Sequence, residues 1–139
     1  FRMNEGWLND EYLILFSEAE SASAASKYKL SQYLPGYVLV GLRGWDDFIV
    51  IDSTGAMCSL PTVPLDSAMV APFSLPKSLC LEPDERFTGK IKWYLKPLIF
   101  GGDPQDKSNL TWINPEQHAE LVVWWNDQYK ALKAEASDT

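Results

Sequence analysis

The chain has 139 residues and a mass of 15.7 kDa, with 46% hydrophobic and 22% charged residues. This length and composition suit one compact domain and exclude a disordered or collagen-like chain. The 12 basic and 19 acidic residues give a net charge of −7. That charge argues against a main role in coating nucleic acid, which requires clustered Lys and Arg.

No apolar run, those at residues 48–51 and 121–125 included, approaches the roughly 20 residues that cross a bilayer. No secretory signal pattern is visible, so we expect a soluble, cytoplasmic protein without a membrane partner. Cys58 and Cys80 have neither the spacing of a disulfide framework nor that of a CxxC site. They indicate free thiols in a reducing cytosol, with a disulfide as the alternative.

In chain order, the first predicted element is a short helix after Asn9-Asp10, with Tyr12, Leu13 and Phe16 on its apolar side. The serine- and alanine-rich stretch at residues 21–26 then reads as a linker or a frayed helix end. Residues 37–41, 48–51 and 56–60 are rich in β-branched and aromatic residues and predict three short strands. Residues 53–55 separate the last two, so we expect a hairpin in which Gly55 takes the left-handed position.

Residues 90–96 alternate so that Ile91, Trp93 and Leu95 share one face and lysines the other. Pro97 marks the end of this strand, a bulge or an edge, and residues 101–109 form a turn-rich loop. Asn114-Pro115 then predicts the start of a helix over about 115–135, with a glutamine at the third helical position. Its apolar stripe contains Leu121, Val122, Trp125, Tyr129 and Leu132.

The acids Asp46, Asp47 and Asp52 lie close together around a predicted strand. Neighbouring carboxylates can act as general acid and base or bind hard cations. Turn capping or a solvated acidic surface explains them more simply, since no metal-binding or catalytic motif accompanies them. We therefore predict no catalytic residue, metal site or cofactor here.

His118, the only histidine, lies at the edge of the apolar stripe of the last helix. We expect a packed or hydrogen-bonded structural residue, with a general base as the alternative. The lysines Lys90, Lys92 and Lys96 could contact phosphate or an acidic partner, but a solvated strand face is the simpler interpretation. Trp45 is expected in an exposed acidic turn, which is typical of a protein-binding surface.

Two parts of the sequence resemble the SUKH superfamily, which includes the fungal cell-wall assembly regulators and many bacterial immunity proteins. Residues 33–41 (YLPGYVLVG) and 45–55 (WDDFIVIDSTG) are similar to its central strands. Residues 100–104 (FGGDP) and 117–126 (QHAELVVWWN) look like the loop and closing helix of bacterial members. The resemblance spans about residues 7–133 and departs from the family pattern at 43–47 and after Val70.

The resemblance implies an α+β single domain over residues 1–139, in which N-terminal and C-terminal helices pack on a bent, mainly antiparallel sheet. It also implies a non-enzymatic protein that binds and neutralises a cognate toxin, often a nuclease. An acidic chain would complement a basic toxin and speed association. Residues 37–72 should supply the contact surface, with these candidate residues: Arg43, Trp45, Asp46, Asp47, Asp52 and Asp66.

Two other functions remain open from the sequence. A regulatory scaffold that binds an endogenous protein would use a similar surface, and genomic context would distinguish it from an immunity protein. A small hydrolase would require His118 to be accessible and within hydrogen-bond reach of a carboxylate in a cleft. The oligomeric state is also open, since an exposed strand edge could pair two copies.

Overall fold

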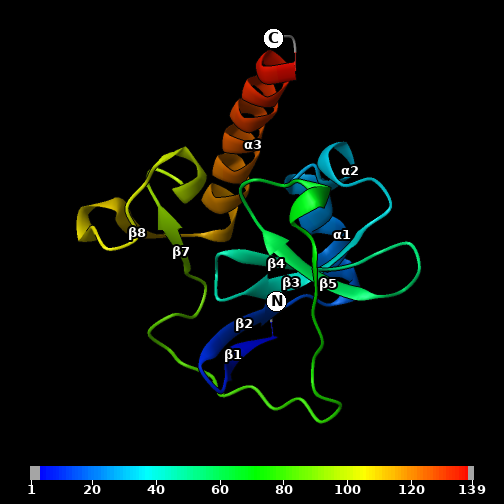
Figure 1. The fold of residues 1–139 in the computed structure, drawn as a ribbon. Coiled ribbons are helices and arrows are strands. Elements are labelled where there is room, and N and C mark those ends of the chain that lie inside the picture. Colours follow the sequence, from blue (N-terminus) through cyan, green and yellow to red (C-terminus); the bar gives the residue numbers. More distant parts are fainter. Residues whose placement is uncertain (1–3, 138–139) are drawn as a thin grey trace.

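The computed structural model describes residues 4–137, which fold into an α+β domain around a six-stranded antiparallel sheet (Figure 1). The strands lie in chain order, so each pairs with the next along the sequence. They are β1 (Asn4–Leu8), β2 (Glu11–Leu15), β3 (Val38–Arg43), β4 (Asp47–Ile51), β5 (Met57–Pro61) and β6 (Ala71–Pro72). The predicted fold class is confirmed.

A smaller antiparallel sheet and three helices complete the domain. The sheet consists of β7 (Ile91–Tyr94) and β8 (Leu110–Ile113), and the helices are α1 (Glu18–Lys27), α2 (Leu30–Tyr33) and α3 (Pro115–Ser137). Single 3-10 turns occur at η1 (Ser67–Met69), η2 (Leu98–Phe100) and η3 (Lys107–Asn109). Because α1 packs against β3 and α3 contacts both α1 and β7, α3 connects the two sheets (Figure 1). Among the described residues, no helix has the length and apolar composition needed to cross a bilayer.

The N-terminal region forms a β-hairpin where the sequence predicts a helix. Asn9 and Asp10 make the turn between β1 and β2, and Asn9 is left-handed (φ 55°). Tyr12, Leu13 and Ile14 are at most 1% exposed, so β2 is buried on both faces. A strand buried on both faces has no polar alternation, and its short apolar run resembles a helix segment. The predicted helix after Asp10 is therefore wrong.

The helix α1 begins at the N-cap Ser17 and includes residues 21–26, so the linker interpretation is also wrong. A capping box fixes its start: the Ser17 hydroxyl accepts from the Glu20 backbone N (3.2 Å), and Glu20 Oε1 accepts from the Ser17 backbone N (2.8 Å). Small side chains let α1 lie close to the sheet, where the Ser21 hydroxyl donates to the Leu39 carbonyl of β3. The Ser-x-x-Glu pattern at residues 17–20 was the available signal for this helix.

The three central strands agree with the predicted meander to within two residues at each end. Gly55 is left-handed (φ 88°) in the turn between β4 and β5, as expected. Phe48 and Val50 of β4 are fully buried and belong to the main core. At Gly41 the strands β2 and β3 approach so closely that a Cβ would overlap the backbone of Ile14.

The second half of the chain matches the prediction less completely. Ile91 and Trp93 are buried on one face of β7, but Leu95 is 56% exposed because the strand ends at Tyr94. The strand β8 was not predicted, since its burial pattern does not follow a strong apolar alternation. The helix α3 begins at Pro115 as expected, with Asn114 Oδ1 accepting from the Gln117 backbone N (2.8 Å).

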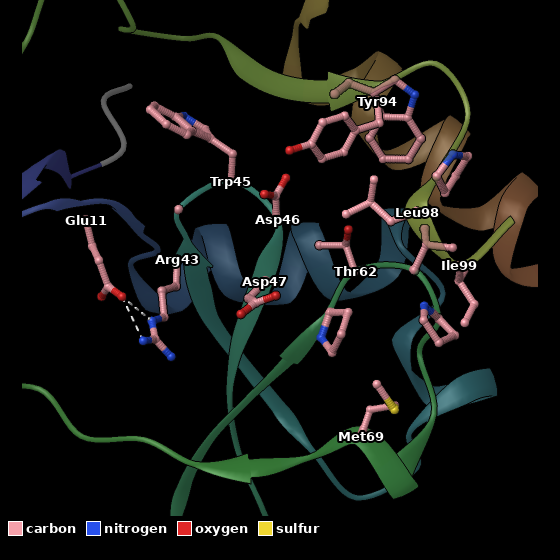
Figure 2. A pocket seen from close by; sticks show the side chains of 16 residues that line it. Glu11, Arg43, Trp45, Asp46, Asp47, Thr62, Met69, Tyr94, Leu98 and Ile99 are labelled. Carbon is pink, nitrogen blue, oxygen red and sulfur yellow. Dashed lines mark hydrogen bonds and ion pairs between the residues drawn. The ribbon is translucent and has the colours of Figure 1, made fainter. Parts of the chain in front are cut away.

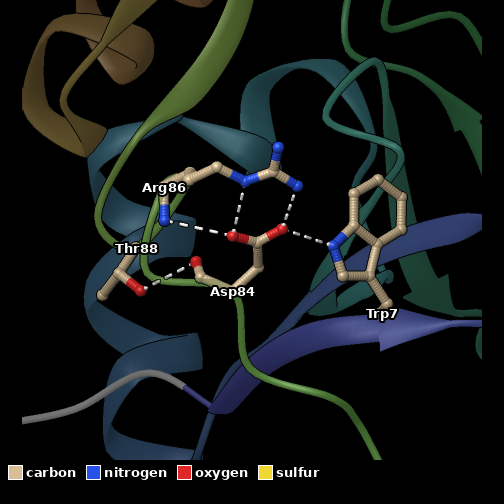
Figure 3. Close-up of polar contacts among 4 residues, drawn as sticks. All are labelled: Trp7, Asp84, Arg86 and Thr88. Atoms are coloured by element: carbon tan, nitrogen blue, oxygen red, sulfur yellow. Dashed lines mark hydrogen bonds and ion pairs between the residues drawn. The ribbon is translucent and has the colours of Figure 1, made fainter.

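The segment that leads into β7 is fixed against β1 by a group of polar contacts (Figure 3). Asp84 accepts from Trp7 Nε1 (3.0 Å) and from the Arg86 guanidinium at Nε (3.0 Å) and Nη2 (2.8 Å). These donors, Arg86 foremost, hold the pKa of Asp84 well below its usual range. Glu82 also forms a β-bridge with Trp7, through backbone hydrogen bonds of 2.8 and 3.0 Å. The irregular segment is thereby attached to the edge of the large sheet.

Candidate functional site

A pocket of about 690 Å³ lies between the large sheet and the start of the 3-10 turn η2 (Figure 2). One wall is the turn after β3 together with the first residue of β4, residues 44–47. A second wall is the last residue of β5 and the segment after it, residues 61–64. The third wall contains Trp93, Tyr94, Leu98 and Ile99. We call it the acidic pocket, because Asp46 and Asp47 both line it.

Asp46 forms an ion pair with Lys92 of β7. Lys92 Nζ lies 2.7 Å from Asp46 Oδ2 and 3.3 Å from the hydroxyl of Tyr94. Burial raises the pKa of Asp46 in spite of this ion pair, although 44% of its side chain remains exposed. Asp46 is therefore a partly desolvated carboxylate with one internal partner.

Asp47 has a similar environment without a direct cation. None of the ion pairs among the described residues includes it, and Arg43 is bonded to Glu11 instead, at 2.7 and 2.9 Å. Burial first, and then the negative charge of Asp46, raise the pKa of Asp47, whereas Arg43 lowers it. A partly buried acid next to another acid favours an incoming positive charge.

Trp45 is half-buried rather than exposed, which corrects the expectation of a free aromatic in a surface turn. Its ring stacks on Tyr12 with centroids 4.9 Å apart and meets Trp7 and Trp112 edge-on at 5.9 and 5.1 Å. It also adopts a left-handed backbone conformation (φ 63°), which turns the chain into the pocket wall. Trp45 is therefore a rigid wall of the acidic pocket, not a freely projecting anchor.

Large exposed apolar side chains line one side of the pocket. Met69 is 46% exposed, Leu98 47% and Ile99 51%. Figure 2 shows Leu98 and Ile99 on the same side of the pocket as Tyr94, with Met69 farther along its edge. We call these three residues the apolar rim. These residues are not among those predicted from the sequence, in which only the adjacent Leu98-Ile99 pair after Pro97 indicates an exposed apolar turn.

Two of the predicted site residues lie outside the pocket lining and have structural partners. Asp52 accepts from the Thr54 hydroxyl (2.6 Å) and from the Ala56 and Thr54 backbone N atoms (3.0 and 2.9 Å), and these bonds, the hydroxyl first, lower its pKa. Asp66 accepts from Lys133 (2.7 Å) and Tyr129 (3.0 Å) of α3, and these bonds lower its pKa to about 2. Asp52 therefore caps a turn, and Asp66 attaches α3 to the segment after β5.

His118 is fully buried, with Nδ1 2.6 Å from the Tyr28 hydroxyl. Within the described part of the chain its Nε2 has no hydrogen-bond partner, and Trp93 packs against the ring at 5.4 Å. Burial lowers its pKa to about 3. This matches the structural interpretation, and it removes the access that the hydrolase hypothesis requires of His118.

The lysine face of residues 90–96 is divided in two. Lys90 and Lys96 are exposed, but Lys92 is only 19% exposed at its side chain and points to Asp46. The expectation of a wholly solvated face is therefore wrong for Lys92, because β7 lies across the pocket from the acidic turn.

Residues 4–137 contain no cluster of three or more His, Cys, Asp or Glu side chains that could hold a metal ion. Cys58 is buried and Cys80 exposed, and both thiols are free.

The chain was compared with protein-family models, curated proteins and solved structures, and no match was found among them.

Proposed function

We propose that this chain is a protein-binding domain that uses the acidic pocket and the apolar rim to hold a basic protein. The observation that carries the proposal is the pair Asp46 and Asp47 at a partly buried pocket, bordered by three large exposed apolar side chains. The carboxylates suit the charged end of an Arg or Lys side chain, and the rim suits the apolar surface around it.

The proposed partner is a cognate bacterial toxin with a basic surface, a class that includes nucleases. The chain neutralises it by stoichiometric binding in the cytoplasm. The sequence resemblance to SUKH immunity proteins supports this class. The net charge of −7 supports it as well, because long-range attraction raises the association rate with a basic protein. A regulatory scaffold with an endogenous partner would use the same surface, and the identity of the bound protein separates the two.

Capture of a partner from the source organism, at low and at high salt, tests the proposal. We expect one basic protein encoded beside this gene, released progressively as salt rises because screening weakens the charge contacts. Several housekeeping proteins would support the scaffold instead. Absence of any specific partner would contradict both.

The substitution Asp47→Asn then tests whether the pocket makes the contact. Asp47 has no ion pair to lose in the described structure, so the neutral amide should leave the fold intact. We expect a loss of affinity of about tenfold or more, since a partly buried charge contact across an interface is worth more than about 1.4 kcal/mol. Asp10→Asn is the matched control, because it makes the same charge change in an exposed turn.

If Asp47→Asn, Asp10→Asn and the unchanged protein bind the partner with equal affinity, the acidic pocket is not part of the interface. The stronger double change, Asp46→Lys with Asp47→Lys, should slow association as well as weaken binding. Leu98→Ser tests the apolar rim separately, and its effect should persist at high salt because apolar burial is not screened.

A further inference from the structure

The charged side chains of the acidic pocket leave one negative charge without a cationic partner. Glu11, Arg43, Asp46 and Asp47 are the charged residues that line the pocket. Arg43 pairs with Glu11 (2.7 Å), and Lys92 of β7 pairs with Asp46 (2.7 Å). None of the ion pairs in the described part of the chain includes Asp47. The pocket therefore favours a ligand that brings one basic side chain.

Apolar side chains lie next to these acids in the same pocket. Figure 2 shows Asp46 and Asp47 between Arg43 on one side and Leu98 and Ile99 on the other. Leu98 and Ile99 are exposed, and Asp46 and Asp47 are partly exposed, so a ligand in the pocket can reach all four. A ligand that fills the pocket should therefore be cationic at one end and apolar at the other.

The volume of the acidic pocket suits several residues of a peptide better than one side chain. Pockets of about 300–1,000 Å³ hold ligands of drug size, and this one has a volume of about 690 Å³. In an extended chain, side chains two residues apart point to the same side and lie about 7 Å apart. Such a chain can direct one side chain at the acids and the next but one at Leu98 and Ile99, while the residue between them points away.

We infer that the acidic pocket binds a short extended peptide segment, in which a basic side chain meets Asp47 and an apolar side chain two residues away covers Leu98 and Ile99. This inference rests on the proposed function, and it adds that the partner is held by a linear segment rather than by a folded face. Arginine suits the basic position, because its guanidinium is more weakly hydrated than an ammonium and loses less when it meets a partly buried carboxylate.

Titration of the ¹⁵N-labelled protein with two capped peptides, Gly-Arg-Ala-Leu-Gly and Gly-Leu-Ala-Arg-Gly, tests this inference in both chain directions. We expect at least one of them to shift the amide signals of residues 44–47 and 98–99. The capped peptide Gly-Arg-Leu-Ala-Gly is the matched control, because it has the same composition but directs the two side chains to opposite sides of an extended chain. It should bind about tenfold more weakly than the better alternating peptide.

Two protein variants separate the contacts. Asp47→Asn should weaken binding of the better peptide about tenfold, and it should not affect the version of that peptide in which glutamine replaces arginine. Leu98→Ser should weaken binding of both versions. Asp10→Asn removes an exposed charge outside the pocket lining and should change neither.

Equal binding of the alternating and adjacent peptides would overturn the inference, as would equal affinity of the arginine peptide for Asp47→Asn and the unchanged protein. Absence of shifts at millimolar concentrations of both alternating peptides would also overturn it. In that case the proposed function would stand if Asp47→Asn still weakened binding of the captured partner, which would then present a folded surface. Binding of the peptides without any captured partner would support the peptide site and contradict only its proposed role.

Discussion

Between about pH 8 and pH 5, acidification should destabilise this protein mainly through one side chain, the buried His118. In the folded state its pKa is about 3, whereas the unperturbed imidazole has a pKa of 6.5. Between these values the unfolded chain binds a proton that the folded protein does not bind. Stability therefore falls as the pH falls below about 6.5 and is fully retained at higher pH.

The magnitude follows from the difference between the two pKa values. A solution at about pH 5 is about 1.5 pH units below the pKa of the imidazole in the unfolded chain, and each unit is worth about 1.36 kcal/mol. His118 should therefore reduce the free energy of unfolding by about 2 kcal/mol at pH 5 relative to pH 8. Asp46 and Asp47 act in the opposite direction, because their pKa values are raised in the folded protein.

Urea unfolding followed by tryptophan fluorescence, between pH 5 and pH 8, measures this effect. The variant His118→Gln lacks the titrating group, so the difference between its pH slope and that of the unchanged protein isolates the imidazole. Since the chain has 1 His, NMR can also follow its ring signal in the folded protein without assignment. Equal pH slopes, or a folded-state titration midpoint near 6.5, would refute the reasoning.

Three further changes test the packing by the same urea assay. Gly41→Ala should cost several kcal/mol or prevent folding, because its Cβ would overlap the backbone of Ile14; a loss below about 1 kcal/mol would contradict the close approach of β2 and β3. Asn126→Ala should cost about 2–4 kcal/mol, since its buried amide accepts from the Leu65 backbone N (2.6 Å) and donates to the Thr62 carbonyl (2.8 Å). Ser17→Ala should cost about 1 kcal/mol, and an unchanged midpoint would mean that the capping box contributes nothing to α1.

The sequence predicted the elements whose signals are local. The turn at Gly55 and the cap at Asn114 depend on neighbouring residues, and both occur where they were expected. The hairpin of β1 and β2 was missed because burial of Leu13 on the second face depends on distant parts of the chain. For the same reason β8 was missed, since its pairing with β7 joins residues about 20 positions apart.

The candidate site shows the same division between local and distant information. The excess of acidic residues in 37–72 singled out Asp46, Asp47, Asp52 and Asp66 as candidates. The sequence does not distinguish the acids that line the pocket from those that stabilise the fold. The separation depends on partners: Asp52 bonds to its own turn, and Asp66 bonds to α3, 63 and more residues away. The position of Lys92 opposite Asp46 likewise requires the packing of β7 across from the acidic turn.

The attachment of Glu82 to Trp7 also determines how the large sheet can meet another protein. It pairs the outer strand β1 with the chain's own backbone at Trp7, and Gly6 lies so close to Glu82 that no side chain would fit between them. The other outer strand, β6, is two residues long and ends in Pro72, which has no backbone N–H to offer. Short and covered edges of this kind disfavour strand addition and edge-to-edge aggregation. Recognition of a partner by this sheet would therefore depend on side chains at the loop end of the strands rather than on a shared ladder of backbone hydrogen bonds.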